Sequence, residues 1–446
     1  MPKFPAPALL LATALSTPAL AAPASDGFFL SGNTRLREEI IDGQARTGVA
    51  PSDQWTSLRT QIRAEYRQGP IQLVGEVYDS RVWGATPASP LSTGEVNTFE
   101  PVQAYIQANL GPVLGKGTKT TVQAGRMALN LGSRRLIAAD DYRNTTNGYT
   151  GLRAQITTTT GLDFTGIYLL PQTRLPDAPT SLLDNGGALD KESFSAVLWG
   201  GFLARQPKGS PYLAEASFIH FGESDAPNSP TRDRHLNNAG LRISADPRPA
   251  HLDGGVETIY QWGSTSTSLS ANARQVPVSA TFLRAHLGYT FTGPWRPHVL
   301  AEFDRASGDG PSGTYGRFDT LFGFRRGDLG PAGLYSALSR SNILTPGIRL
   351  EITPSKRFDA FVGYRALWLA DAHDSFAGTG VRDATGKSGS FAGHQIDTRA
   401  RRWLIPNHLR AEINATYLAR GHFLQTAPGA AKSDTKYASF ALSAFF

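Results

Sequence analysis

Polar and apolar residues alternate with a period of two along most of the chain. In residues 58–67, Leu58, Ile62 and Tyr66 fall on one face, whereas Arg59 and Arg63 fall on the other. Successive side chains of a β-strand point to opposite faces, so such a segment predicts a strand with one apolar and one polar side. The clearest further cases are residues 102–110, 348–353, 409–417 and 437–446.

Weaker alternation recurs between these segments, and the candidate strands number 16 to 18. Short turns such as Gln68-Gly69-Pro70 and Gly111-Pro112 separate some strands, and long polar stretches such as 306–341 separate others. Short turns at one end and long loops at the other are typical of a transmembrane barrel with an even number of strands. We therefore predict an all-β protein, a single antiparallel transmembrane β-barrel whose lumen is wide enough for water.

A soluble β-sandwich or β-helix would also show alternation, because its strands pack one face against a core. Large aliphatic residues would then dominate the apolar face. Here that face is rich in Ala, Leu, Val and Tyr, and aromatic residues stand near strand ends, as at Tyr66, Trp262, Trp368 and Tyr417. Aromatic residues at strand ends are typical of the interfacial girdles of membrane barrels, so the barrel is favoured.

The first residues resemble a secretory signal peptide. Lys3 precedes an apolar stretch, residues 8–15, and Ala19 and Ala21 frame a small-residue cleavage site. We expect cleavage after Ala21, which divides the chain into a signal peptide, 1–21, and a barrel, 22–446. Together with the barrel pattern, export predicts a location in the bacterial outer membrane.

Composition narrows the chemistry. The chain has no cysteine, which excludes disulfides and thiolate ligands, and its nine histidines lack ligand spacing, so we predict no metal site and no cofactor. Carboxylates at Asp309 and Asp319 leave a calcium site as a minor alternative. The net charge of +7 is mild, and an exported barrel is an improbable partner for nucleic acid. We expect a monomer, and the sequence does not define a periplasmic partner.

Charges on the strands must face the water-filled lumen, because an Arg or Lys facing lipid at mid-bilayer costs about 2–4 kcal/mol. Most lumen charges are expected to pair across neighbouring strands. An excess of arginine would favour anionic solutes, because its planar fork of donors matches a carboxylate. The expected inward charges are Arg59, Arg63, Arg67, Arg153, Arg242, Arg284, Arg349, Arg365, Arg399, Arg401, Arg410, Glu65, Glu76, Glu257, Glu302, Asp304, Glu351, Asp359, Asp397 and Glu412.

Several segments resemble the alginate-export porins, a family of outer-membrane proteins. They are Gly75–Arg81, Gly125–Ile137, Asp141–Thr145, Tyr149–Arg153, Asp304–Asp309 and Phe318–Phe322. The chain departs from the family pattern at Met127, Tyr142, Tyr149 and Thr150, which bears on sugar specificity more than on fold. The resemblance implies an 18-stranded barrel with an arginine-rich lumen for a polyuronate, and it makes Arg81, Arg126, Arg143 and Arg153 candidates for the selectivity lining.

Two details stay open at this stage. Strict alternation from Val122 would turn Arg126 toward lipid, and a bulge at Gly125 would turn it inward. Arg134, Arg135, Arg143 and Asp140 form either part of that lining or a salt-bridged loop cluster that holds a constriction or rim.

The favoured function is an outer-membrane channel, not an enzyme, through which an anionic poly- or oligosaccharide such as alginate passes passively. The alternative is a general porin for small anionic solutes. An enzyme is least favoured because His220, His235, His286 and His394 have no matching serine context. The expected partners are the anionic solute and the lipid of the outer membrane. The candidate lumen residues are Arg63, Glu76, Arg81, Arg126, Arg143, Arg153, Arg349, Arg365, Arg399 and Arg401.

Overall fold

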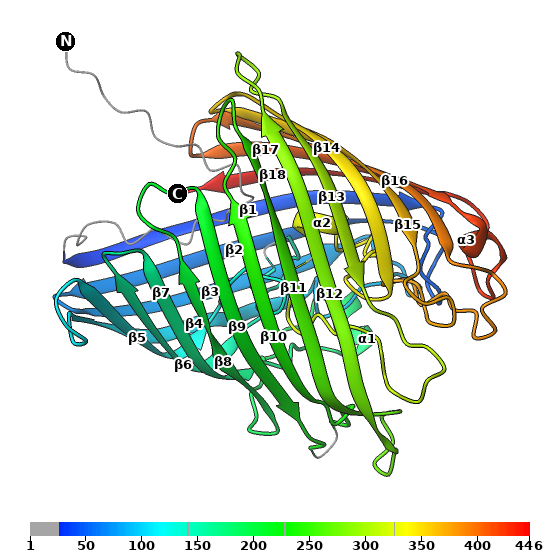
Figure 1. Cartoon of the computed structure of the whole chain (residues 1–446), viewed down its shortest axis with the longest axis horizontal. Helices are drawn as coiled ribbons and strands as arrows, with labels where there is room; N and C mark the ends of the chain where they lie inside the picture. The colour runs from blue at the N-terminus through cyan, green and yellow to red at the C-terminus, as the bar shows by residue number, and fades with distance from the viewer. Residues whose placement is uncertain (1–25, 141, 227–228, 325) are drawn as a thin grey trace.

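The computed structural model describes residues 26–140, 142–226, 229–324 and 326–446, and the expected signal peptide lies outside them. The described residues form 18 strands and three short helices (Figure 1). The strands are β1 (Gly27–Asp42), β2 (Ser52–Gln68), β3 (Ile71–Trp83), β4 (Asn97–Gly111), β5 (Thr118–Met127), β6 (Tyr149–Thr158), β7 (Leu162–Pro171), β8 (Ala196–Arg205), β9 (Tyr212–Glu223), β10 (His235–Ala245), β11 (Leu252–Ser266), β12 (Gln275–Thr290), β13 (His298–Ala306), β14 (Ile343–Ser355), β15 (Phe358–Trp368), β16 (Phe391–Ile405), β17 (Leu409–Arg420) and β18 (Thr435–Phe445). The helices are α1 (Pro179–Leu183), α2 (Arg326–Leu329) and α3 (His422–Thr426). Within the described residues, no helix has the length and hydropathy of a membrane-spanning segment.

Each strand pairs antiparallel with the next, and β18 pairs with β1 to close the barrel. The closing ladder runs from Asn33 opposite Phe445 to Asp42 opposite Lys436. The backbones of Gly32 and Phe446 exchange hydrogen bonds of 3.0 and 3.1 Å next to it. Closure leaves no unpaired edge strand, and the predicted 18-stranded antiparallel barrel is confirmed.

Strand register assigns one face of each strand to the lumen. On β2 and β3, Arg63 lies opposite Glu76, and the next pair along is Ile62 opposite Val77. Side chains of one pair share a face and those of the next pair share the other, so the ionic pair faces inward and the aliphatic pair faces lipid. All the strand charges expected to face inward from their alternation lie on the lumen face by this register.

Aromatic side chains gather on the outer face of β8, β9 and β11. Trp199 contacts Phe218 at 5.7 Å between ring centroids, Phe218 contacts Trp262 at 6.2 Å, and Trp262 stacks on Tyr260 at 5.5 Å. Rings with an apolar body and a polar tip suit the membrane–water interface. This cluster is part of the aromatic girdle that the sequence predicts.

Alternation alone does not reveal β1 and β5. On β1, Glu38 and Asp42 occupy the outward face while Arg37 and Glu39 occupy the inward face, so charge marks both sides. β5 begins Thr-Lys-Thr-Thr, with hydroxyl groups on both faces. Both are strands because their neighbours supply a complete ladder of backbone partners, which no local pattern reports.

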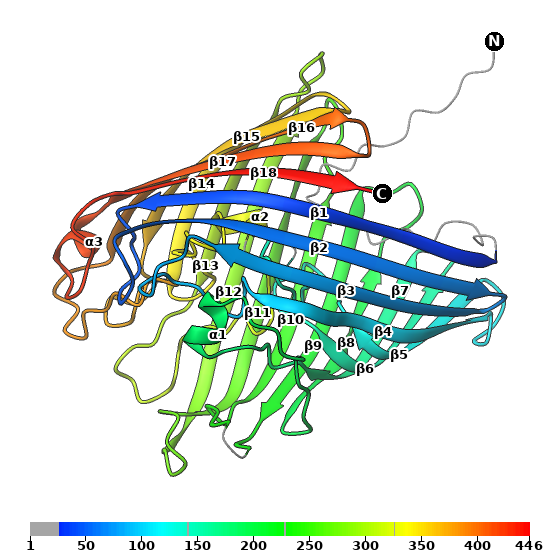
Figure 2. The same ribbon diagram turned by 180° about the vertical axis from the view of Figure 1, so that it is seen from behind.

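The two ends of the barrel differ. The turns β2–β3 and β14–β15 are short, and they lie at the end where β1 begins and β18 finishes (Figures 1 and 2). The connections at the other end include the segments 128–148 and 307–342. In this layout the short turns are periplasmic and the long loops are extracellular. α2 belongs to segment 307–342 and lies inside the barrel in both views.

Candidate functional site

Two long extracellular loops fold into the lumen and pair with each other. The first inward loop is residues 128–148 and the second is residues 307–342, in both cases apart from the residues outside the described ranges. Phe322 is the link: its N–H donates to the carbonyl of Leu136 (3.0 Å) and its carbonyl accepts from Ala138 N–H (3.1 Å). The resulting bridge between Ile137 and Phe322 is parallel. Two segments far apart in sequence therefore form one body inside the barrel.

This body has an apolar core. Ile137, Phe318, Leu334 and Tyr335 have no exposed surface. They belong to one buried cluster that also contains wall residues such as Leu367. Burial of large apolar side chains contributes about 25 cal/mol per Å², so the loops are held in the lumen chiefly by packing.

Polar contacts fix the first inward loop to the wall formed by β1 and β2. The carbonyl of Arg143 accepts hydrogen bonds from Arg35 (2.7 Å) and Arg59 (3.1 Å). Arg37 donates to the carbonyl of Tyr142 (2.7 Å), and its guanidinium lies 4.5 Å from the centre of that ring. Arginines of the wall are thus used to hold the loop backbone in place.

Asn144 fastens the same loop to β2 and β3. Its side-chain Nδ2 donates to the carbonyls of Leu58 (3.0 Å), Arg81 (3.2 Å) and Glu95 (3.0 Å). The backbone carbonyl of Asn144 accepts a hydrogen bond from the Ser80 hydroxyl (2.7 Å). A buried amide with this many backbone partners defines one loop position, because any shift would leave several polar groups unsatisfied.

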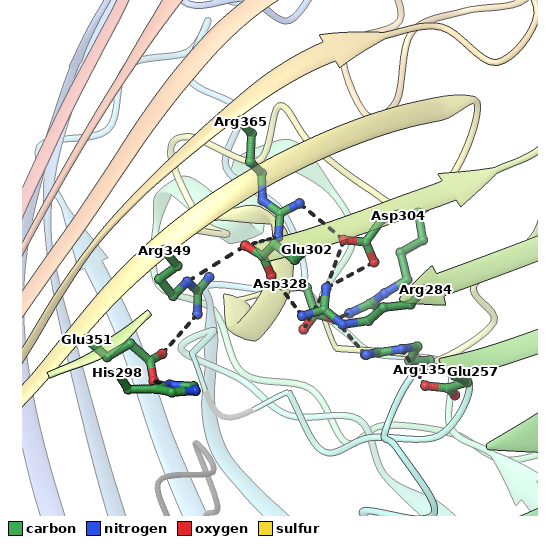
Figure 3. A network of polar contacts seen from close by, with 11 residues as sticks. Arg135, Glu257, Arg284, His298, Glu302, Asp304, Asp328, Arg349, Glu351 and Arg365 are labelled. Atoms are coloured by element: carbon green, nitrogen blue, oxygen red, sulfur yellow. Dashed lines mark hydrogen bonds and ion pairs between the residues drawn. The ribbon is translucent and has the colours of Figure 1, made fainter. Parts of the chain in front are cut away.

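An ionic network joins both inward loops to the opposite wall (Figure 3). Arg135 of the first loop lies 2.6 Å from Asp328 of the second and 2.9 Å from Glu257 on β11. Asp328 also binds Arg340, and it lies 3.9 Å from Arg284 on β12. Asp328 is therefore the carboxylate on which the two loops and the wall converge.

The network continues along the wall as a four-membered ionic cluster. Arg284 lies 2.8 Å from both Glu302 and Asp304 on β13, and Arg365 on β15 lies 2.6 and 3.1 Å from the same two carboxylates. All four side chains are buried. Buried pairs of this kind add little net stability, but removing one partner costs about 3–5 kcal/mol because a charge is left uncompensated.

Burial opposes the ionisation of Asp328, but the guanidiniums of Arg135, Arg284 and Arg340 outweigh it, so its pKa lies well below the ordinary value. Opposite charges within a few ångströms favour the charged form. The contact between the two loops is therefore an ion pair at neutral pH.

Below the loops, toward the periplasm, a chamber of about 270 Å³ opens against β10–β14. Arg135, Arg242, Arg349 and Glu351 are among the side chains that line it. His298 on β13 also lines it, with Nδ1 3.1 Å from Glu351 and Nε2 3.1 Å from Asp253. The chamber wall thus carries charges of both signs held in defined pairs.

Most candidate residues from the sequence lie on the lumen face. Arg63 and Glu76 face each other across β2 and β3. Arg399 and Arg401 on β16 both bind Asp359 on β15, at 3.1 and 3.0 Å. Further along this wall, Arg349 lies 3.6 Å from Glu351, and Arg365 belongs to the four-membered cluster. The structure therefore brings Arg349, Arg365, Arg399 and Arg401 together on one wall.

Arg153 occupies the facing wall. Its guanidinium donates to the side-chain carbonyls of Gln123 (3.0 Å) and Gln155 (3.1 Å). Its hydrogen-bonded partners are thus neutral amides, in contrast to the arginines of β12–β16.

Arg81 does not line the lumen, and that expectation was wrong. It lies opposite Leu58, a lipid-side residue of β2, and pairs with Asp79 (2.7 Å) on the same outer face. Ser80 and Val82, its neighbours, point inward. The charge is tolerated outward because it sits at the extracellular end of β3 beside a partner, away from mid-bilayer.

No bulge forms at Gly125, so the expected inward turn of Arg126 was also wrong: by strand register Arg126 lies on the outer face of β5, two residues from Ala124. Pairing is regular through Gly125 opposite Tyr105 and Gly151. The nearby register shift lies instead in β4, between Pro101 and Gln103. Arg126 reaches the carboxylates of Glu100 (2.6 Å) and Glu192 (3.0 Å), which belong to β4 and to the loop after β7.

Arg135 and Arg143 of the first inward loop are salt-bridged, as one of the two interpretations of this cluster expects. Arg143 lies 2.8 Å from Asp140, and Arg135 binds the network described above. The sequence did not identify Arg37, Glu39 or Asp328 as partners. Arg37 and Glu39 lie on the unrecognised strand β1, and Asp328 lies in a loop whose inward course no local signal reports.

Within the described ranges, no group of three or more metal-ligating side chains is placed to hold a metal ion. Asp319 lies 2.6 Å from Arg234, and Asp309 accepts a hydrogen bond from the Gly316 N–H (3.0 Å). In the structure these carboxylates stabilise the loops through an ion pair and a hydrogen bond.

The sequence profile described as alginate export matches residues 30–438, nearly the whole barrel. The chain belongs to the alginate export family. No curated protein sequence matches it. Membership accounts for the resemblance of its loop and strand segments and for the 18-stranded architecture.

Solved structures of outer-membrane channels share the fold. OccAB1 of Acinetobacter baumannii superposes with a TM-score of 0.58 at 11% identity, covering 94% of this chain and 96% of that one. OccD3 (OpdP) of Pseudomonas aeruginosa gives 0.55 at 14% identity, covering 94% and 91%. OpdK of the same organism, in its structure with vanillate, gives 0.56 at 11% identity, covering 94% and 100%. This member of the family is therefore a bacterial outer-membrane channel of porin type and not an enzyme.

Proposed function

We propose that this channel passes an anionic oligo- or polysaccharide, a uronate chain in chemical terms, passively across the outer membrane. Family membership supports the substrate class. The closed barrel, in which every strand is paired within the chain, supports a monomeric channel. The lumen charges support the preference for anions.

The main evidence for this preference is that several lumen arginines are more exposed than the carboxylates they bind. Arg63 and Arg67 are 27% and 32% exposed, and their shared partner Glu65 is 10% exposed. Arg242 on β10 is 23% exposed, and its partner Glu215 is 11% exposed. The carboxylates lie closer to the wall, so a solute in the lumen meets guanidinium donors first.

Asp359 is an exception to this difference in exposure, but the charge of its cluster is still positive. It is 28% exposed, but both Arg399 and Arg401 bind it. Arg401 is 27% exposed, and a guanidinium has five N–H donors, more than one carboxylate can accept. The second carboxylate can come from a passing sugar acid. Partly exposed arginines on β2, β10 and β16 would offer successive contacts along the lumen.

Block of ion current by oligosaccharides of matched length tests this proposal. Purified protein in a planar bilayer is exposed to a hexauronate and to a neutral hexaglucan. We expect the uronate to block at a lower concentration by about tenfold, and Arg401→Gln to reduce that preference. Equal block by the two sugars would overturn the proposal.

A small carboxylate is the second candidate solute, and two observations favour it. The inward loops leave a chamber of about 270 Å³, which suits a molecule the size of one sugar or aromatic acid. The fold neighbour OpdK has a structure with vanillate, itself a carboxylate. Uptake of monomeric acids with no uronate block would select this candidate.

A further inference from the structure

A continuous chain of side-chain hydrogen bonds crosses four strands on the wall that faces the arginines. It starts at Asn109 on β4, whose side-chain carbonyl accepts from Gln107 Nε2 (3.3 Å). The Gln107 carbonyl accepts in turn from Gln123 Nε2 on β5 (2.9 Å). We call Asn109, Gln107, Gln123, Arg153 and Gln155 the amide belt.

Arg153 is the central donor of the amide belt. It donates to the Gln123 carbonyl on one side and to the Gln155 carbonyl on the other, and Gln155 Nε2 then donates to Asp163 on β7 (2.7 Å). Every amide therefore has its orientation set by its neighbours, and the oxygen and nitrogen of each are distinguished. A fixed polar group is worth more to a ligand than a mobile one, because no ordering is needed on binding.

The belt retains hydrogen-bonding capacity toward the lumen. A primary amide has two N–H donors, and Gln107, Gln123 and Gln155 each use one of them along the chain. Gln107 and Gln155 are half-buried and Asn109 is exposed, so water reaches this wall at these three residues, whereas Gln123 between them is buried. The remaining donors are spaced along the periplasmic half of the lumen.

An aromatic residue lies next to the belt. Tyr105 is two residues from Gln107 on the inward face of β4, and Arg63 donates to its hydroxyl (3.4 Å). The inward positions beside it on β5 and β6 are Gly125 and Gly151, which carry no side chain. A ring beside fixed amides combines an apolar face with oriented donors, as in small-molecule sites.

We infer that the amide belt is a sugar-hydroxyl binding surface, which recognises the uncharged part of a saccharide independently of its carboxylates. Sugar hydroxyls both donate and accept hydrogen bonds, and the amides of the belt supply neutral N–H donors and C=O acceptors. The arginine-bearing strands β14–β16 lie half-way round the 18-stranded barrel from β5. A uronate chain between them would meet amides with its hydroxyls and guanidiniums with its carboxylates. This inference rests on a saccharide being the solute.

Equilibrium dialysis in detergent tests the belt without requiring an open channel. The ligands are a neutral hexaglucan and a hexauronate, and the variants are Gln107→Leu with Gln123→Leu, Gln155→Leu alone, Arg399→Gln, and Gln275→Leu. Gln275 is a matched amide at the extracellular end of β12. Folding of each variant is checked by the resistance of its folded band to unfolding in SDS at room temperature. If the double variant folds poorly, the single variant Gln155→Leu still tests the belt.

The belt variants should weaken binding of both sugars at least about fivefold, since one lost hydrogen bond contributes about 1 kcal/mol. Arg399→Gln should weaken only the uronate, and Gln275→Leu should change neither. Unchanged binding of the neutral sugar by the Gln155→Leu channel, or its absence in the wild type, would overturn the inference. Equal affinity of the wild type for the two sugars would instead count against the proposed function.

Discussion

Arg135 and Asp328 form an ion pair of 2.6 Å that joins the two loops folded into the lumen. Neither residue lies on a strand, and 193 positions separate them in the sequence. The pair lies where the first inward loop, the second inward loop and the wall strand β11 meet, because Arg135 also binds Glu257. The contact therefore links the position of both loops to the wall.

Breaking this pair should loosen the loops and raise conductance. In Arg135→Ala, Asp328 keeps Arg340, but Glu257 loses the guanidinium it is ion-paired with in a buried site and keeps the hydrogen bond from the Ser133 hydroxyl. Removing one partner of a buried ion pair costs about 3–5 kcal/mol. We expect a larger mean single-channel current and more frequent transitions than in the wild type. Arg305→Ala is the matched control, because Arg305 faces outward on β13 and donates to Thr281. Identical traces for the Arg135→Ala and Arg305→Ala channels would show that the loops do not limit the current.

Asn144→Ala should release the first inward loop from β2 and β3. The change removes the amide whose two N–H donors serve the carbonyls of Leu58, Arg81 and Glu95. Two lost hydrogen bonds correspond to about 2 kcal/mol of stability. Hydrogen exchange of residues 128–148 should become about 10- to 50-fold faster, with the strands unchanged. A substitution in a periplasmic turn, Asn407→Gly, is the control, and it suits the positive φ of 62° there. Unaltered protection of the loop in Asn144→Ala would contradict the role of this residue.

The loop after β7 should lose stability as pH rises. Burial, together with the nearby Glu100 carboxylate, raises the pKa of Asp190 from 3.8 to about 7. The folded loop binds the proton more tightly than the unfolded loop, so the stabilisation is complete below about pH 4 and is lost as pH rises to about 7. Exchange rates of residues 172–195, corrected for intrinsic pH dependence, should rise across this window.

Asp190→Asn provides the control for the pH experiment, since an amide cannot titrate. Its exchange rates should be flat between pH 4 and 7 after the same correction. A wild-type profile that is equally flat, or one that falls as pH rises, would show that Asp190 titrates in its ordinary range.

Arg81→Gln and Arg401→Gln separate the two faces of the barrel. Arg401 faces the lumen beside Asp359, whereas Arg81 faces outward beside Asp79. We expect Arg401→Gln to lower the anion-to-cation permeability ratio by about twofold and Arg81→Gln to leave it unchanged. A change in selectivity in Arg81→Gln alone would reverse the assignment of the faces on β3.

The barrel was largely predictable because its main determinant is local. Each charged residue on an amphipathic strand must avoid lipid, so Arg63, Arg349 and Arg401 were assigned inward from their neighbours alone. The strand β1 was not predicted because Glu38 lies on its outer face, where it is exposed and hydrogen-bonded to Thr56. Arg81 was misplaced because the resemblance, and not its own alternation, made it a lumen candidate.

The candidate site was less predictable because it depends on loops. Arg134, Arg135, Arg143 and Asp140 were expected either to line the channel or to form a salt-bridged loop cluster, and in the structure Arg135 and Arg143 are salt-bridged. Their partners are set by tertiary contacts, as with Asp328, or by backbone carbonyls, as with Arg35. Hydrogen bonds from an arginine to a loop carbonyl leave no mark in the sequence, since any residue supplies that carbonyl.

The reversal potential in a tenfold gradient of potassium chloride tests the central claim most directly, because it reports the sign of the lumen field during conduction. The guanidiniums of Arg63, Arg67 and Arg242, which are 23–32% exposed, predict a reversal potential of the sign expected for a chloride-selective channel. A potential on the potassium side would mean that the carboxylates dominate the path, and an anion channel would be contradicted.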